Sequence, residues 1–123
     1  MESLNVALLQ TDAGVAQSLA ATLGRSFRAV HCVRSLDELR QEVAKNCDEV
    51  VILDVETVPF SEIKRLSREF PALRIVCTHR LADEDMWTDA LNAGAADICP
   101  SGDTRGILTA ALRDVRRLRS AAA

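Results

Sequence analysis

The sequence predicts one α/β domain built on a parallel sheet, and two observations support that fold class. The run Val50–Asp54 places four large apolar residues directly before a carboxylate, which is typical of a central strand covered by helices on both faces. Short apolar runs alternate with stretches of helical period at intervals of roughly 20–25 residues, as right-handed β-α-β units require. A chain of 123 residues is long enough for one such core and too short for two, so we expect a single domain over 1–123.

The first half of the chain predicts three strands and two helices. Residues 5–9 form a short apolar run, and the amphipathic helix that follows it ends at Gly24. Residues 27–33 form a second candidate strand. Ser35 and Glu38 then fit a capping box, in which each side chain satisfies a free amide at the start of the next helix. The acid-terminated run described above is the third strand.

The second half continues the same alternation. Pro71 closes the third helix, because proline cannot continue a helix, and Gly94 stops the fourth. The expected elements are a helix over 62–70, a strand over 74–78, a helix over 84–93, a strand over 96–99 and a helix from about 104 to 118.

Composition and charge exclude two broad classes of function. A formal charge of −3 and only three phenylalanines and one tryptophan argue against nucleic-acid binding, which needs a basic surface and often stacking rings. No apolar stretch approaches the roughly 20 residues of a membrane span. Residues 1–4 contain neither a basic region nor an apolar core, so we expect no signal peptide and a cytoplasmic protein.

One basic cluster and four cysteines complete the survey of reactive and charged groups. The basic cluster lies on the last predicted helix and suits either a solvated helix end or a partner-docking face. It comprises Arg113, Arg116, Arg117 and Arg119. The cysteines show no Cys-x-x-Cys spacing, and we expect them to be small, reduced core residues rather than metal or redox groups. They are Cys32, Cys47, Cys77 and Cys99.

Polar side chains follow four of the predicted strands, at the ends that a parallel sheet brings together. The tripeptide 10–12 follows the first strand, Asp54 ends the third, Thr78 ends the fourth, and Ser101 or a neighbour follows the fifth. Ligands bind beyond the carboxyl ends of strands in open α/β sheets, so we expect these groups to share one crevice. They can bind a cation or a phosphoryl group, or hydrogen-bond one another. In the last case a buried Asp54 needs backbone amides or a neighbour such as Thr11.

In its order of elements the chain resembles the receiver domains of two-component response regulators, over about residues 5–118. The strand that ends in Asp54, the strand that ends in Thr78 and the stretch 93–97 carry the resemblance. It implies a doubly wound five-stranded sheet of order 2-1-3-4-5, in a flavodoxin-like three-layer αβα fold. It also implies that Asp54 accepts a phosphoryl group from a sensor histidine kinase with the help of Mg²⁺, and that Thr78 supplies a switch hydroxyl.

The sequence departs from that family at the metal site. Gln10 and Thr11 stand where the family has two adjacent acids, and Asp12 follows one residue later. The resemblance leaves as metal ligands Asp12, Asp54, the backbone carbonyl of Glu56 and, weakly, Gln10. Because Mg²⁺ binds mainly through carboxylates, we expect weakened binding. Asp12 can instead cap the first helix, and the Glu56 side chain is expected to point to solvent.

Two further family residues are replaced. Ser101 stands at the position of a lysine that follows the fifth strand, and an alternative alignment places Cys99 and Pro100 at that lysine and the proline after it. Ile98 stands at the position of the switch aromatic. Without an ammonium group to neutralise the equatorial oxygens, phosphoryl transfer is expected to be slower by roughly 10²–10³.

These observations favour a non-enzymatic signalling domain. The first reading is an atypical receiver domain in phosphorelay signalling that regulates through partner binding, with phosphorylation at Asp54. The alternative is a phosphorylation-independent docking module with the same fold, and a flavodoxin-like small-ligand domain is a third, although no glycine-rich phosphate loop is present. Expected partners are a sensor histidine kinase or another signalling protein, and a second copy of the chain through the fourth helix, fifth strand and fifth helix. Trp87 on that fourth helix suits either the core or an interface.

Overall fold

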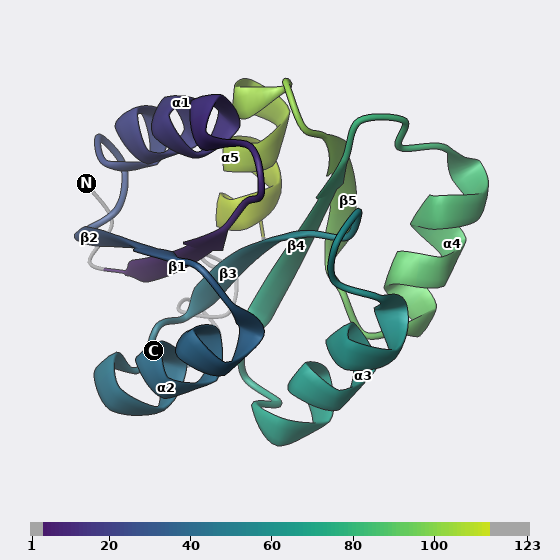
Figure 1. Cartoon of the computed structure of the whole chain (residues 1–123), viewed down its shortest axis with the longest axis horizontal. Helices are drawn as coiled ribbons and strands as arrows, with labels where there is room; N and C mark the ends of the chain where they lie inside the picture. Colours follow the sequence, from purple (N-terminus) through teal and green to yellow (C-terminus); the bar gives the residue numbers. More distant parts are fainter. Residues whose placement is uncertain (1–3, 114–123) are drawn as a thin grey trace.

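The computed structural model describes residues 4–113 and contains a five-stranded sheet between two layers of helices (Figure 1). The strand order is β2-β1-β3-β4-β5 and every neighbouring pair is parallel, which confirms the predicted doubly wound αβα fold. In chain order the elements are β1 (Asn5–Leu9), α1 (Ala13–Leu23), β2 (Ala29–Val33), α2 (Leu36–Asn46), β3 (Val50–Asp54), α3 (Phe60–Glu69), β4 (Arg74–His79), α4 (Glu84–Asn92), β5 (Asp97–Pro100) and α5 (Thr104–Leu112).

Strand β3 lies at the centre of the sheet and is buried along its whole length. It pairs with β1 on one side and β4 on the other, as the unbroken apolar run predicts for a strand covered on both faces. The register with β4 places Asp54 directly beside Thr78. The best-buried strand of the sheet therefore carries the aspartate at its carboxyl end.

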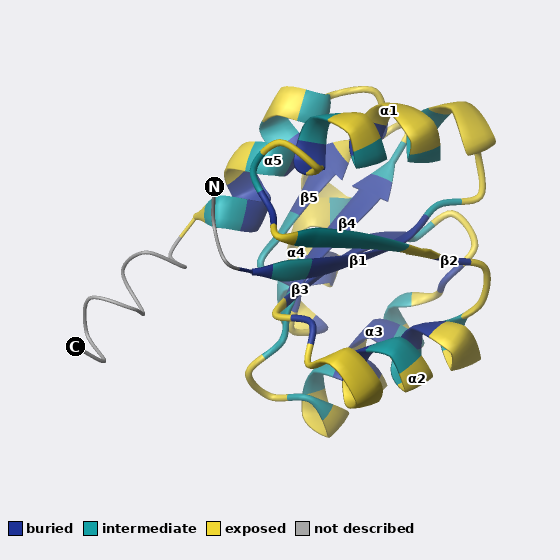
Figure 2. Ribbon diagram, turned by 90° about the vertical axis from the view of Figure 1, so that its left-hand side faces the viewer, coloured by how far each residue is buried: buried dark blue, intermediate teal, exposed yellow. Residues whose placement is uncertain are grey.

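Each face of the sheet packs against its own layer of helices, whose outer surfaces are exposed (Figure 2). Successive side chains of a strand point to opposite faces, so neighbouring residues of β3 join different cores. Ile52 packs with the residues of α1 and α5, including Leu19 and Ile107. Leu53 packs with the residues of α2, α3 and α4, including Ile63.

The predicted boundaries of five elements shift by one or two residues, and among them β4 ends at His79 and α4 at Asn92. β2 begins at Ala29 rather than at 27, although Phe27 is buried as the strand pattern required. α3 begins at Phe60, because Pro59 occupies the cap position in an extended conformation. β5 is Asp97–Pro100 rather than 96–99.

The C-terminal part of the predicted last helix lies outside the described residues, and so do Arg116, Arg117 and Arg119. Within 4–113, α5 is Thr104–Leu112 and Arg113 follows it. No helix in this described part of the chain combines the length and apolarity needed to cross a bilayer.

The start of α2 confirms one half of the predicted capping box. The Ser35 hydroxyl accepts a hydrogen bond from the Glu38 amide at 3.1 Å. The Glu38 carboxylate accepts from the amide of Arg34, at 3.4 Å, rather than from that of Ser35.

The cysteine prediction is right for two residues and wrong for two. Cys77 and Cys99 are buried in the sheet, and burial raises the pKa of the Cys77 thiol to about 12 and that of Cys99 to about 11. Cys32 and Cys47 are exposed. Cys32 lies on β2, an edge strand with one poorly covered face, and Cys47 caps α2 in a left-handed conformation with φ 55°.

Candidate functional site

The polar residues that follow the strands meet at the carboxyl edge of the sheet, as predicted. They line a cavity of about 400 Å³ above the end of β3. Its lining comes from the segments after β1, β3, β4 and β5, and consists of Gln10, Thr11, Asp12, Val15, Asp54, Glu56, Thr57, Arg80 and Ser101. Thr78 lies beneath this cavity, fully buried.

Both carboxylate oxygens of Asp54 have hydrogen-bond donors. The side chain is buried, with the residue 4% exposed. The Thr11 hydroxyl donates to Oδ2 at 2.8 Å, and the Glu56 amide donates to Oδ1 at 2.9 Å. A buried carboxylate without partners is costly, and these two neutral donors remove much of that cost. The expectation that a backbone amide and Thr11 donate hydrogen bonds to the Asp54 carboxylate therefore agrees with the observed geometry.

Thr78 is hydrogen-bonded to Gln10 rather than to Asp54. The Gln10 amide donates to Thr78 Oγ1 at 2.9 Å, and the hydroxyl can in turn donate to Gln10 Oε1 at 3.2 Å or to the Leu53 carbonyl at 3.5 Å. The hydroxyl is completely buried. The neutral Gln10 side chain therefore engages the Thr78 hydroxyl.

Asp12 caps the first helix. It is the residue before α1, and its Oδ1 accepts hydrogen bonds from the amides of Gly14 at 2.8 Å and Val15 at 3.2 Å. A carboxylate at a helix N-terminus is stabilised by these free amides. Asp12 therefore lines the cavity with its charge already engaged.

An ion pair between Glu56 and Arg80 borders the cavity, and the sequence analysis missed it. Arg80 Nε lies 2.6 Å from Glu56 Oε1. Glu56 is an exposed residue, as expected, but its side chain is paired with Arg80 rather than free in solvent. The hydrogen bond to Glu56 raises the pKa of Arg80, and the charges of Glu56 and Asp54 add to the shift. Glu56 follows β3 and Arg80 follows the neighbouring strand β4. The register between these two strands is the information from which the pair could have been predicted.

Ser101, rather than Cys99 or Pro100, lines the cavity. Ser101 is nearly buried, whereas Cys99 packs into the core beneath α1 and α5. Ile98 is buried in the core on the other face, among the residues of α2, α3 and α4. The group that the segment after β5 contributes to the cavity around Asp54 is therefore a neutral hydroxyl.

The residues around Asp54 do not fit a complete Mg²⁺ site. Both oxygens of Asp54 accept from donors, Oδ1 of Asp12 caps α1, and the Glu56 carboxylate pairs with Arg80. Gln10 contributes a neutral amide that is bonded to Thr78. Mg²⁺ favours free carboxylate oxygens, so this arrangement argues for weak binding.

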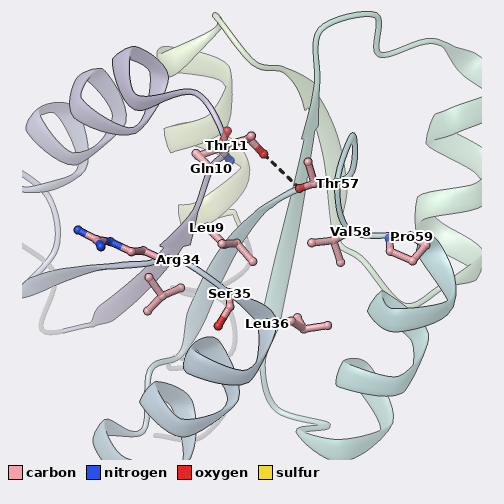
Figure 3. A pocket seen from close by; sticks show the side chains of 10 residues that line it. Leu9, Gln10, Thr11, Arg34, Ser35, Leu36, Thr57, Val58 and Pro59 are labelled. Atoms are coloured by element: carbon pink, nitrogen blue, oxygen red, sulfur yellow. Dashed lines mark hydrogen bonds between the residues drawn. The ribbon is translucent and has the colours of Figure 1, made fainter.

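A second cavity, of about 510 Å³, adjoins the first on the side of α2 (Figure 3). It shares Gln10, Thr11 and Thr57 with the first cavity, and a hydrogen bond of 3.2 Å joins the hydroxyls of Thr11 and Thr57. The rest of its lining is mainly apolar, with Arg34 as its one charged residue among those described. The two cavities meet at Thr11, the residue that holds Asp54.

The chain folds as a doubly wound α/β domain. Its candidate site lies at the carboxyl edge of the sheet, where the buried Asp54 ends the central strand and polar residues line the crevice around it. No protein-family model matches the sequence, and no curated protein matches it significantly. Solved structures do match, and they are consistently response regulators or their receiver domains.

Three of these structures illustrate the similarity. The response regulator DrrB of Thermotoga maritima, an OmpR/PhoB homolog, has a TM-score of 0.80 at 16% identity, over 95% of this chain and 54% of that one. The receiver domain of a response regulator from Bacteroides fragilis has 0.80 at 21%, over 90% and 95%. An atypical orphan response regulator, described as having a phosphorylation-independent regulatory mechanism, has 0.80 at 11%, over 92% and 96%.

The chain therefore has the fold of response regulator receiver domains, and it spans about half the length of DrrB.

Proposed function

We propose that this chain is an atypical receiver domain, a non-enzymatic module of phosphorelay signalling in the cytoplasm that regulates a partner protein by binding it. One observation carries the proposal. The residues at receiver-domain site positions form a network of two hydrogen-bonded pairs, in which the Thr11 hydroxyl donates to Asp54 and the Gln10 amide donates to Thr78. The receiver-domain fold supports the signalling role, and the network supports the atypical one.

The network favours a mode of regulation that does not depend on phosphorylation of Asp54. A phosphoryl group on Asp54 brings negative charge that needs cations and free donors around it. Here Gln10 and Thr11 are neutral, Ser101 stands at the position of the ammonium, and the Thr78 hydroxyl is already bonded. Ile98, an aliphatic core residue, has no ring whose rotation could report a change at Thr78.

One observation favours a second mode, in which Asp54 is phosphorylated. The Arg80 guanidinium lines the same cavity as Asp54 and carries a positive charge. In this mode an Asp54 oxygen attacks the phosphorus of a phosphohistidine, so that a P–O bond forms, the P–N bond breaks and the histidine nitrogen keeps the electron pair. A guanidinium can hold phosphoryl oxygens by paired hydrogen bonds, in place of the lysine.

The output surface that we propose is formed by α4, β5 and α5. Trp87 on α4 is 49% exposed, and it lines a shallow pocket with Ile98 and Pro100 of β5. Arg113, at the end of α5, is exposed and pairs with Asp97 at 3.4 Å. An exposed tryptophan beside charged residues is typical of an interface. The partners that we propose for this surface are a sensor histidine kinase or another signalling protein, and a second copy of the chain.

Intact-mass spectrometry with acetyl phosphate and Mg²⁺ distinguishes the two modes. The phosphorylation-independent mode predicts no mass increase in the wild-type chain or in the Asp54→Asn control. An increase of one phosphoryl group that is absent in Asp54→Asn would instead establish the second mode. In that case Arg80→Gln should slow the labelling, because it removes the positive charge of the cavity.

Self-association through the proposed surface can be measured by sedimentation. We expect Trp87→Ala to weaken any dimer of the wild-type chain while leaving its fold intact, because the ring is half exposed. Leu81→Ala is a matched control, since Leu81 is also an exposed large apolar residue but does not line the Trp87 pocket. A dimer that is unchanged in Trp87→Ala would place the interface elsewhere.

A further inference from the structure

Three potential metal ligands from separate elements come together at the end of the sheet away from Asp54. They are His31 on β2, Glu42 on α2 and Asp48 in the connection before β3. One ligand atom from each lies within 4.8 Å of the others. Among residues 4–113, this is the one place where three or more histidine, cysteine or acidic side chains gather in this way.

The His31 ring lies between the two carboxylates. Its Nδ1 is 3.3 Å from Glu42 Oε1, and its Nε2 is 3.9 Å from Asp48 Oδ1. One imidazole nitrogen binds one ion, and two ligands of a tetrahedral ion with bonds of about 2.0–2.2 Å stand about 3.4 Å apart. A single His31 nitrogen and one oxygen from each carboxylate, which lie within 4.8 Å of one another, would therefore close to about that spacing around an ion. The His31 side chain is 34% exposed, which opens the cluster to solvent.

Asp48 provides the second and independent observation. Its side chain is completely buried, and neither of its carboxylate oxygens has a hydrogen-bond partner. A buried carboxylate that lacks donors is stabilised by a proton or by a cation, and the neighbouring Glu42 and His31 make a cation the better complement.

We propose that His31, Glu42 and Asp48 bind a divalent transition-metal ion of the Zn²⁺ type. One imidazole and two carboxylates suit Zn²⁺, and the imidazole disfavours Mg²⁺ and Ca²⁺, which prefer oxygen ligands. Three protein ligands with an opening at His31 leave a fourth position for water or for a group from a partner. Because the ligands join the edge strand β2 to α2 and to the start of β3, the ion would stabilise that edge of the fold.

Zn²⁺ titration of the full 123-residue chain, after treatment with a chelator, tests the site. Calorimetry should give one ion per chain, and Zn²⁺ but not Mg²⁺ should raise the midpoint of thermal unfolding. The variants His31→Gln, Glu42→Gln and Asp48→Asn should each weaken binding by more than about 10-fold. His31→Gln is the safest of the three for folding because its side chain is the most exposed of the three, and circular dichroism confirms the fold of each variant.

Three controls separate this site from others. Glu38→Gln removes an acid from the same helix but outside the cluster, and it should bind Zn²⁺ as the wild type does. The double variant Cys32→Ser, Cys47→Ser removes the exposed thiols and should also bind normally. Asp54→Asn should have no effect. The proposal is overturned if no ion binds, if the three ligand variants bind as tightly as the wild type, or if only the cysteine variant loses the ion.

Discussion

Strand β3 has a buried aspartate near each end, and the two carboxylates are held in opposite ways. Asp54, at the carboxyl end, accepts hydrogen bonds from the Thr11 hydroxyl and the Glu56 amide. Asp48, just before the amino end, has no hydrogen-bond partner for either oxygen and lies 3.9 Å from Nε2 of His31, whose ring also faces Glu42. The comparison indicates that neutral donors make Asp54 stable as it stands, whereas Asp48 needs a proton or a cation.

The largest expected change in unfolding free energy comes from replacing the neutral neighbours of Asp54 with acids, which makes its surroundings resemble those of Asp48. The double variant Gln10→Asp, Thr11→Asp removes a donor and adds like charges beside Asp54, so the free energy of unfolding should fall by about 2–4 kcal/mol in EDTA. Mg²⁺ at about ten times its Kd should return about 1.4 kcal/mol. Urea denaturation with and without Mg²⁺ measures both changes.

Conservative replacements at the same positions, Gln10→Asn with Thr11→Ser, serve as the control and should show no response to Mg²⁺. If the acidic double variant were as stable in EDTA as the wild type, the view that neutral donors stabilise Asp54 would be wrong.

The next effect isolates a single donor. Thr11→Val keeps the shape of the side chain but removes the hydroxyl that donates to Asp54, and it should cost about 1–2 kcal/mol of unfolding free energy. Thr57→Val is the matched control, because Thr57 bonds to Thr11 and to a backbone carbonyl but not to the Asp54 carboxylate. Equal costs for the two variants in urea denaturation would contradict the special role of Thr11.

A smaller effect of opposite sign is expected at the other end of β3. Burial raises the pKa of Asp48 to about 6, so between about pH 4 and pH 6 the folded chain holds more protons than the unfolded one and stability falls as the pH rises. Glu42, Glu49 and His31 are the charged groups that act on Asp48. In EDTA, Asp48→Asn should therefore stabilise the chain by about 1–2 kcal/mol at about pH 8 and by almost nothing at about pH 4.

Denaturation of the wild type and of Asp48→Asn over that pH range measures the difference, and Asp54→Asn provides the comparison at the opposite end. A gain of the same size in Asp54→Asn would remove the contrast between the two carboxylates.

The smallest effect is expected at the Glu56–Arg80 pair. Arg80 is exposed, so Arg80→Gln should leave the urea midpoint unchanged. Arg40→Gln is the informative control, because Arg40 is largely covered and joins α2 to α3 through Glu62 and Glu69. The hydrogen bond to Glu69 is the first cause of its raised pKa, and its loss should cost about 1 kcal/mol. A loss in Arg80→Gln as large as in Arg40→Gln would mean that the exposed pair is structural.

Local patterns in the sequence predicted most of the fold. The run of β3, the glycine after α1 and the caps at Ser35 and Asp12 are each decided within a few residues, because strand burial and helix ends depend on neighbouring side chains and amides. The same local reading anticipated Asp54 and Thr78 as neighbours at one sheet edge, since parallel strands align their carboxyl ends.

Only the tertiary structure decided how the charged and polar groups pair. The hydrogen bond between Gln10 and Thr78 joins residues 68 positions apart, and the Glu56–Arg80 pair depends on the β3–β4 register. The exposure of Cys32 follows from β2 being an edge strand, which depends on strand order rather than on its own apolar pattern. The sequence by itself determined which groups stand at the ends of the strands. Their partners were decided by long-range packing, because a hydrogen bond or an ion pair depends on the spacing and direction of side chains that distant segments bring together.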